Sequence, residues 1–187
     1  MLPLLTVIGT HSIYNPRGVN IAALLLRIIL GVTMIAHGYN HIWGGGKIEG
    51  TGRWFASLGM KPGPLHAWLA SVTELGAGAL LIVGLFNAVA AAGVVGVMTV
   101  ALIINHFKNG FFIFRPGEGY EYVLNLTVAA LALGALGPGA WSLDRVAKIH
   151  VAGVAGIGIT AVLGIGGALL LLAIFWRPER KPDDAAA

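Results

Sequence analysis

The sequence predicts an all-α membrane protein, a four-helix transmembrane bundle with an added fifth C-terminal transmembrane helix. Of its 187 residues, 57% are hydrophobic and only 11% are charged, whereas soluble domains carry about 25% charged residues. Such a composition excludes a water-soluble fold, and it also excludes intrinsic disorder, which requires low hydrophobicity and high charge. Five apolar stretches fill the chain, and each is close to the ~20 residues that a helix needs to cross a bilayer.

The first half of the chain holds three predicted spans, which are connected by one loop and one tight turn. The first span covers residues 20–41, and a loop rich in glycine and proline follows over residues 44–64. The middle of that loop, residues 54–58, is amphipathic and is expected to lie in the membrane interface. The second and third spans, residues 65–86 and 88–105, form one apolar stretch of roughly twice the length of a single span. Asn87, just after Gly84, therefore predicts a tight helical hairpin.

The second half of the chain holds two more spans. A polar loop over residues 106–119 leads to the span 120–136, a short connector covers 141–150, and the last span covers 151–176. The predicted organisation is therefore an N-terminal interfacial segment (1–19), a four-helix membrane bundle (20–140), a connector and fifth transmembrane helix (141–176), and a polar tail (177–187).

Small residues recur at every fourth position of the last span and so share one helical face. They are Ala152, Gly156, Thr160, Gly164 and Ala168. Small faces let membrane helices approach closely. The sequence leaves two interpretations open, a packing seam within the bundle and a contact with a partner subunit.

The Lys and Arg residues predict the orientation. With five spans, the loops 44–64 and 106–119 and the C-terminal tail share one side, which holds eight Lys and Arg residues against three on the other. By the positive-inside rule, the side with more positive charge is cytoplasmic. The excess of positive charge is explained by these loops, so no nucleic-acid partner is expected.

Two charged residues lie deep within apolar segments. Arg27 lies in the first span and Glu74 near the middle of the second. Intramembrane charges are costly, and they normally face the bundle interior and pair. We therefore expect an Arg27–Glu74 ion pair, either as a structural contact or as a carboxylate whose protonation is linked to a bound ligand.

Polar residues converge at the end of the bundle that carries the two long loops. His37 and His41 are four residues apart and share a helix face. Because helix direction alternates, His66, His106 and Glu121 fall at the same depth. One interpretation is the polar and aromatic belt of a membrane interface; the other is a pocket with the Arg27–Glu74 pair as its floor.

Such a pocket suits a quinone headgroup, because His or Tyr can donate to its carbonyl oxygens and a carboxylate can exchange protons. The candidate catalytic residues are Glu74, His37 and Glu121. The candidate cofactor-binding residues are Arg27, His37, His41, Glu74, His106, Glu121, Tyr120 and Asn125. Haem ligation by His37 or His41 is an alternative. No metal site is expected, and the absence of cysteine excludes thiolate ligands and thiol redox chemistry.

Several motifs resemble those of the DoxX-like family of small bacterial integral membrane proteins. They are residues 26–31 leading to His37-Gly38, residues 55–64, residues 74–80, and Gly110-Phe111-Phe112 followed by residues 119–122. The resemblance implies a four-helix membrane bundle in the bacterial plasma membrane. It also implies a role in quinone-coupled sulfur oxidation, as a subunit of thiosulfate:quinone oxidoreductase, or in a membrane complex for oxidative-stress defence. The fifth span departs from the family pattern, and Asn40 and His41 stand where the family usually has a Lys.

Two functions follow as hypotheses. The first is a membrane-embedded accessory subunit of a redox complex that interacts with quinone, with other subunits bound through the fifth helix. The second is a non-catalytic scaffold or assembly subunit. No P-loop, GxSxG or HExxH motif is present, so the sequence contains no complete catalytic motif of these kinds and leaves open whether the chain is an enzyme.

Overall fold

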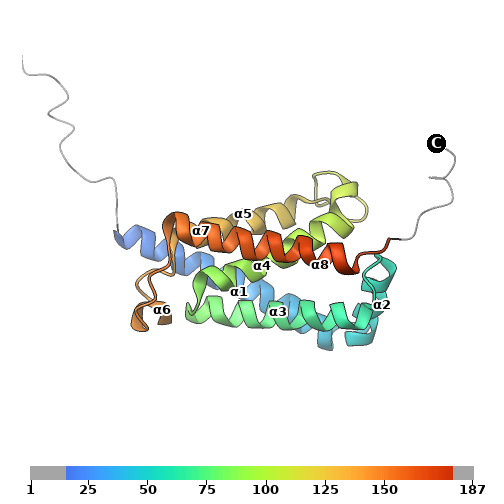
Figure 1. The fold of residues 1–187 in the computed structure, drawn as a ribbon, viewed down its shortest axis with the longest axis horizontal. Helices are drawn as coiled ribbons and strands as arrows, with labels where there is room; N and C mark the ends of the chain where they lie inside the picture. Colours follow the sequence, from blue (N-terminus) through green and yellow to red (C-terminus); the bar gives the residue numbers. More distant parts are fainter. Residues whose placement is uncertain (1–15, 179–187) are drawn as a thin grey trace, which may run out of the picture.

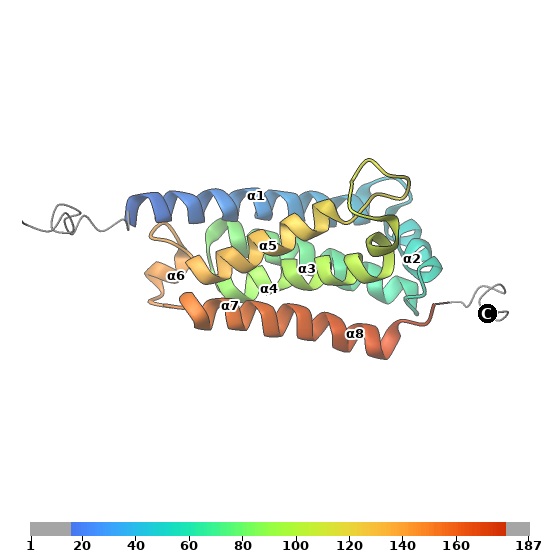
Figure 2. The same ribbon diagram turned by 90° about the horizontal axis from the view of Figure 1, so that it is seen from above.

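The computed structural model describes residues 16–178, which form a helical bundle (Figures 1 and 2). Most of the predicted N-terminal segment and of the polar tail lie outside the described residues. Two π-helical segments (η2, η4) and one 3-10 turn (η3) continue or interrupt the α-helices. The elements are α1 (Pro16–Trp43), α2 (Lys47–Ser57), α3 (Gly63–Val83), α4 (Asn87–Ala101), η2 (Leu102–His106), η3 (Phe107–Asn109), α5 (Glu121–Leu136), α6 (Leu143–Val146), α7 (Gly153–Ala161), η4 (Val162–Gly166) and α8 (Gly167–Phe175).

Within residues 16–178, four helices are long and apolar enough to cross a membrane. They are α1, α3, the continuous helix from α4 to η3, and the continuous helix from α7 to α8. The protein is therefore an all-helical, multi-pass membrane protein. The last predicted span is among these four. The short helix is α5, whose 16 residues extend about 24 Å at 1.5 Å per residue, less than the ~30 Å hydrocarbon core.

The predicted hairpin at Asn87 is confirmed. α3 ends at Val83, Gly84 follows in the left-handed conformation, and α4 begins at Asn87. α4 then runs through the middle of the bundle, where it packs against α3, α5, α7 and η4. In Figure 2, α1 and α7–α8 lie on opposite sides, with the other long helices between them. The core is built from residues of α1, α3, α4 and α5, including Leu30, Leu81, Val94 and Leu133.

Close packing of α1 on α3 depends on glycine. A Cβ added to Gly78 would lie 2.7 Å from the carbonyl oxygen of Gly31, and a Cβ added to Gly38 would lie 3.1 Å from the Glu74 Cβ. Side chains larger than hydrogen at these positions would push the helices apart. The glycines therefore bring the end of α1, which carries His37 and His41, directly against Glu74 on α3.

The small-residue face of the last span is a packing seam within the bundle. Gly156, Thr160, Gly164 and Ala168 are buried, and the Thr160 hydroxyl donates to the Ala88 carbonyl oxygen at 3.0 Å. A Cβ on Gly156 would collide with the backbone of Gly134 on α5. This face is therefore occupied by α4 and α5 and is not available to a partner.

The predicted Arg27–Glu74 pair is wrong. Arg27 is 1% exposed, and its guanidinium donates to four backbone carbonyl oxygens at 2.7–2.9 Å. Those of Leu81 and Ile82 end α3, and those of Pro138 and Trp141 lie between α5 and α6. The carbonyls at the C-terminal end of a helix have no partner within the helix. The free carbonyls at the end of α3 therefore accept the hydrogen bonds of the guanidinium, about two turns beyond Glu74.

Asp144 completes the same structural unit from α6. Its carboxylate accepts from the backbone N–H groups of Phe86 and Asn87 at 2.7 and 2.9 Å. These groups are at the N-terminus of α4, where a negative charge is favourable. Arg27 and Asp144 thus hold the two helix ends of the hairpin, at the end of the bundle where α6 lies (Figure 1).

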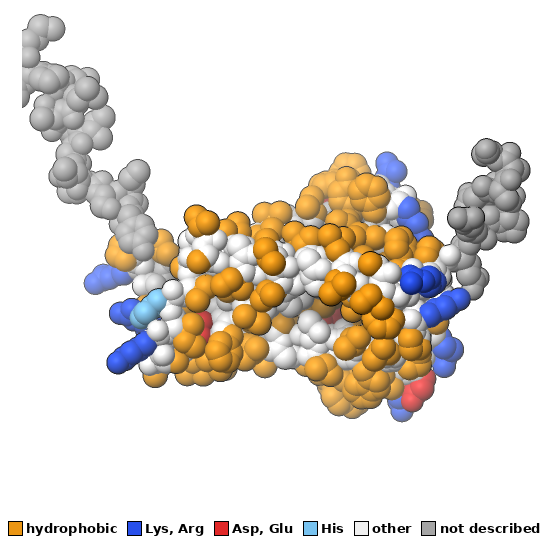
Figure 3. All heavy atoms as spheres, viewed as in Figure 1, with side chains coloured by type: hydrophobic (Ala, Val, Ile, Leu, Met, Phe, Trp, Pro, Cys, Tyr) orange, Lys and Arg blue, Asp and Glu red, His pale blue; other side chains and the backbone are white. Residues whose placement is uncertain are grey.

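The opposite end of the bundle is closed by α2 and by the end of α8. Met60 and Trp176 form an antiparallel bridge, the Arg177 N–H donates to the Gly59 carbonyl at 2.7 Å, and the Trp176 indole donates to Leu58. Lys and Arg side chains gather at both ends, with an apolar surface between them (Figure 3), as expected for a protein that spans a bilayer.

Candidate functional site

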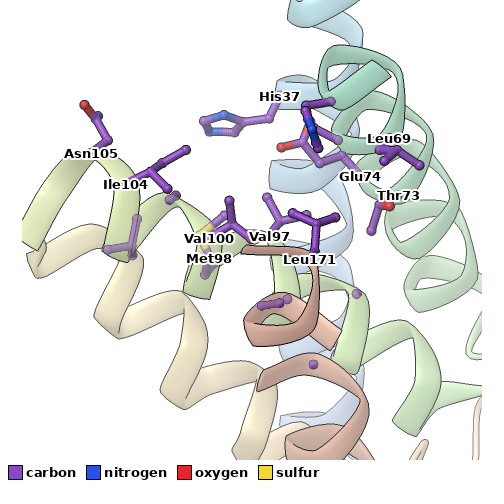
Figure 4. Close-up of a pocket in the computed structure, with 18 of the residues that line it drawn as sticks. His37, Leu69, Thr73, Glu74, Val97, Met98, Val100, Ile104, Asn105 and Leu171 are labelled. Atoms are coloured by element: carbon purple, nitrogen blue, oxygen red, sulfur yellow. The ribbon is translucent and has the colours of Figure 1, made fainter. Parts of the chain in front are cut away.

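A cavity of about 510 Å³ lies between α3, α4 and the η4–α8 segment. This volume is within the range of small-molecule sites, ~300–1,000 Å³. Figure 4 shows Leu69, Thr73 and Glu74 on α3 across the opening from residues of α4 and η2, with Leu171 of α8 nearby. The end of α1, α2 and residues from the loop before α5 complete the lining.

Glu74 and His41 meet at the polar end of this cavity. The Glu74 residue is 2% exposed, and its Oε2 lies 3.0 Å from His41 Nδ1. α2 fixes the position of His41: the Thr51 hydroxyl donates to the His41 carbonyl oxygen at 3.0 Å, and the Phe55 ring meets the imidazole edge-on. The pair brings together a buried carboxylate and an imidazole, the groups that most often transfer protons in proteins.

His66 lies in the first turn of α3 and also lines the cavity. Its ring is held edge-on against Phe175 at a centroid distance of 5.1 Å. The residue is 3% exposed, and its Nε2 has no hydrogen-bond partner. Buried polar atoms nearly always have a partner. This nitrogen is therefore positioned to bind a ligand or water within the cavity.

Two further contacts connect the cavity to α5 and to the loop before it. The Tyr122 hydroxyl lies 3.4 Å from His37 Nε2, and the two rings stack at 6.1 Å. His106 Nδ1 lies 3.0 Å from the Glu118 carbonyl oxygen. Because a carbonyl can only accept, Nδ1 carries the hydrogen, which leaves His106 Nε2 as an acceptor in the neutral ring.

The remainder of the cavity is apolar and lined partly by π-helical segments. α4 contributes small side chains, including Ala92, Gly93 and Gly96, and the opposite wall comes from Leu163 to Leu171. The π-helix η2 supplies Ile104, Asn105 and His106, and η4 supplies Leu163 and Gly164. π-Helical turns are rare in proteins, and those that do occur are frequently found at functional sites.

The structure brings only part of the predicted cluster into the cavity. Of the eight candidate cofactor-binding residues, four line it: His37, His41, Glu74 and His106. The other four, Arg27, Tyr120, Glu121 and Asn125, are outside the lining. The Glu121 carboxylate accepts from the Ile113 N–H at 3.2 Å, the Asn125 amide donates to the Glu121 carbonyl, and the Tyr120 ring stacks on Phe107.

Some lining residues were not among the binding candidates. His66 belongs to the predicted convergence of polar groups, but Thr73, Glu118 and Tyr122 do not. Glu121 and Tyr122 are neighbours at the start of α5, so their side chains point about 100° apart on the helix. Only the rotation of α5 about its axis decides which one faces the cavity, and the sequence gives no signal for that rotation.

The comparison with protein families agrees with the resemblance noted in the sequence. The DoxX family model matches residues 22–107. Residues 22–107 therefore form a DoxX region. The matched residues include His37, His41, His66, Glu74 and His106, so the polar end of the cavity lies mainly within the DoxX region. α5 and α7–α8 follow that region in the chain, and they contribute Tyr122 and the apolar wall.

Neither the comparison with curated proteins nor the comparison with solved structures gives a match to this chain. Across the described part of the chain, no group of three or more His, Asp or Glu side chains is placed to hold a metal ion.

Proposed function

We propose that this protein is a membrane-embedded accessory subunit of a redox complex and binds a quinone in the cavity. The observation that carries the proposal is the polar end of the cavity, where the buried Glu74–His41 pair lies with the unpartnered Nε2 of His66. A quinone is apolar apart from its carbonyl oxygens, which need hydrogen-bond donors. The cavity offers this combination, apolar walls with a few polar groups at one end.

The residues at the polar end have distinct roles in this proposal. His41 and His66 donate to the quinone carbonyl oxygens, and Glu74 orients His41 through the 3.0 Å contact between its Oε2 and His41 Nδ1. Reduction of a quinone to its quinol takes up two electrons and two protons. The protons pass through the Glu74–His41 pair, and the electrons come from a redox subunit of the complex, since the chain has no cysteine.

The proposed setting follows from the family. Resemblance to DoxX proteins supports a role in sulfur oxidation or oxidative-stress defence, in the bacterial inner membrane and with partner subunits. Since the small-residue face of α7–α8 is buried in the bundle, partners would bind its outer face. That face exposes large apolar residues, including Val154, Val162, Leu170 and Ile174, and it also contacts lipid. Haem ligation by His37 or His41 is a separate proposal that a Soret absorbance band would support.

We also propose that α5 crosses the membrane, so that five helices span it and the α2 end is cytoplasmic. A chain without cysteine allows a direct test by single-cysteine labelling with an impermeant maleimide. We expect Arg115→Cys, in the loop before α5, to react only from the cytoplasm and Lys148→Cys, after α5, only from outside. Both residues are exposed. Labelling of both from one side would show that α5 does not cross.

Quinone binding is tested with the purified protein in mild detergent. Trp54 lines the cavity, and quinones quench indole fluorescence, so titration with the tail-less quinone duroquinone is expected to give saturable quenching. The saturable part should disappear in Trp54→Phe and persist in Trp43→Phe, because Trp43 is exposed and does not line the cavity.

The same titration separates the proposal from the scaffold hypothesis. Quenching that rises linearly with duroquinone, or that is unchanged in Trp54→Phe, would contradict a quinone in this cavity. A scaffold subunit would instead copurify with partners in fixed ratio and bind no quinone.

A further inference from the structure

The cavity extends from its polar end along α4 and reaches the surface between α3 and the η4–α8 segment. Three of its lining residues are large, apolar and well exposed: Leu69 (41%), Val89 (51%) and Leu163 (52%). All three lie within helices long and apolar enough to span the membrane. The mouth of the cavity therefore faces the hydrocarbon region of the bilayer.

Glycine keeps this part of the cavity open. Gly96 on α4 and Gly167 at the start of α8 both line it. A Cβ on Gly96 would meet its nearest neighbour at 3.4 Å, and a Cβ on Gly167 would meet nothing within 4 Å. Gly96 therefore lies beside the backbone of Gly164 on η4, where a Cβ would make an ordinary contact, and Gly167 leaves open space that a side chain would fill.

The cavity wall opposite α3, formed by η4 and α8, is held by hydrogen bonds at both ends. The opening therefore exists without any displacement of this helix. On one side of η4, Thr160 of α7 is bonded to α4. On the other side, the end of α8 is bonded through Trp176 and Arg177 to residues 58–60. The π-helical turn η4 lies between these two attachments, and its Gly164 contacts α4 directly.

We propose that the ligand is an amphiphile with a long prenyl or alkyl tail that enters sideways from the bilayer. Its headgroup lies against Glu74, His41 and His66. Its tail runs over Gly96 and past Gly167 to leave between α3 and α8. The proposal rests on the quinone function proposed above and adds that the groove on α4 selects for the tail. An amphiphile shaped in this way matches a cavity with polar groups at one end and a lipid-facing mouth at the other.

The test compares two neighbouring glycines. Gly167→Leu places a side chain in the groove, whereas Gly166→Leu adds the same side chain at an exposed position outside the lining with nothing within 4 Å. Each variant is titrated with decylubiquinone, which carries a ten-carbon tail, and with tail-less duroquinone, in the same detergent. Since each buried methylene contributes to affinity, we expect Gly167→Leu to weaken decylubiquinone binding about tenfold or more and to leave duroquinone binding unchanged. Gly166→Leu should bind both as the wild type does.

The outcomes distinguish the two proposals. If the wild type does not bind duroquinone, the proposed quinone function fails together with this inference. If duroquinone binds but Gly167→Leu affects neither quinone, or both equally, the tail does not lie in the groove and only this inference is overturned. A groove filled by a bilayer acyl chain would give that result. Gly96→Val, which fills the groove from α4, is expected to repeat the selective loss and serves if Gly167→Leu does not fold.

Discussion

Replacement of Arg27 by Met is expected to reduce the free energy of unfolding by at least about 3 kcal/mol, the scale for removing one partner from a buried charge network. The four carbonyl oxygens that accept from Arg27 would lose their donor in a buried site. Each unsatisfied buried group costs about 1–3 kcal/mol, and the carboxylate of Asp144 would lose its nearby positive charge. Thermal unfolding in detergent, followed by size exclusion, measures the loss.

Two related variants test the reason for this loss. Asp144→Asn keeps the volume but weakens the bonds from the Phe86 and Asn87 N–H groups, so its melting temperature should fall between those of Arg27→Met and the wild type. Arg145→Met removes an exposed charge from α6 and should melt as the wild type does. If the melting temperature of Arg27→Met equalled that of Arg145→Met, Arg27 would not stabilise the hairpin.

The sequence predicts the depth of Arg27 in the membrane but not its hydrogen-bond partners. Depth along the helices predicted that four histidines lie at one end of the bundle, and all four line the cavity, because depth depends only on residue number and helix direction. It could not predict that the free carbonyls at the end of α3 would compete for Arg27, as they do. Glu74 pairs instead with His41, one of the histidines expected at a different depth.

Local sequence signals predicted where helices begin and end better than they predicted which side of each helix faces the cavity. Gly84 and Asn87 marked the hairpin because left-handed backbone favours glycine. Tyr122 lines the cavity and Glu121 does not. The rotation of α5 about its axis decides this, and that rotation depends on the packing of side chains that are far apart in the sequence. The π-helical turns η2 and η4 leave no recognised pattern in the sequence, yet both line the cavity.

Substitution of Glu74 by Gln is expected to weaken duroquinone binding about tenfold, which corresponds to ~1.4 kcal/mol. Gln keeps the shape of the side chain but removes the carboxylate whose Oε2 lies 3.0 Å from His41 Nδ1, and a carboxylate attracts an imidazole N–H more strongly than a neutral amide does. The amide oxygen of Gln can still accept from His41, so we expect a smaller loss of melting temperature than in Arg27→Met. Ser71→Ala is the matched control, since Ser71 lies on α3 one turn before Glu74, is fully buried and does not line the cavity.

A double-mutant cycle then decides whether Glu74 and His41 act together. If Glu74 acts by orienting His41, Glu74→Gln, His41→Gln and the double variant should all lose about the same affinity, since residues in direct contact couple strongly. Additive losses would mean that each side chain contacts the quinone independently, and full affinity in Glu74→Gln would remove the carboxylate from the site. Coupling without loss of melting temperature would separate a ligand-binding pair from one that only fixes α1 against α3, because the structural role alone predicts a change in stability and none in affinity.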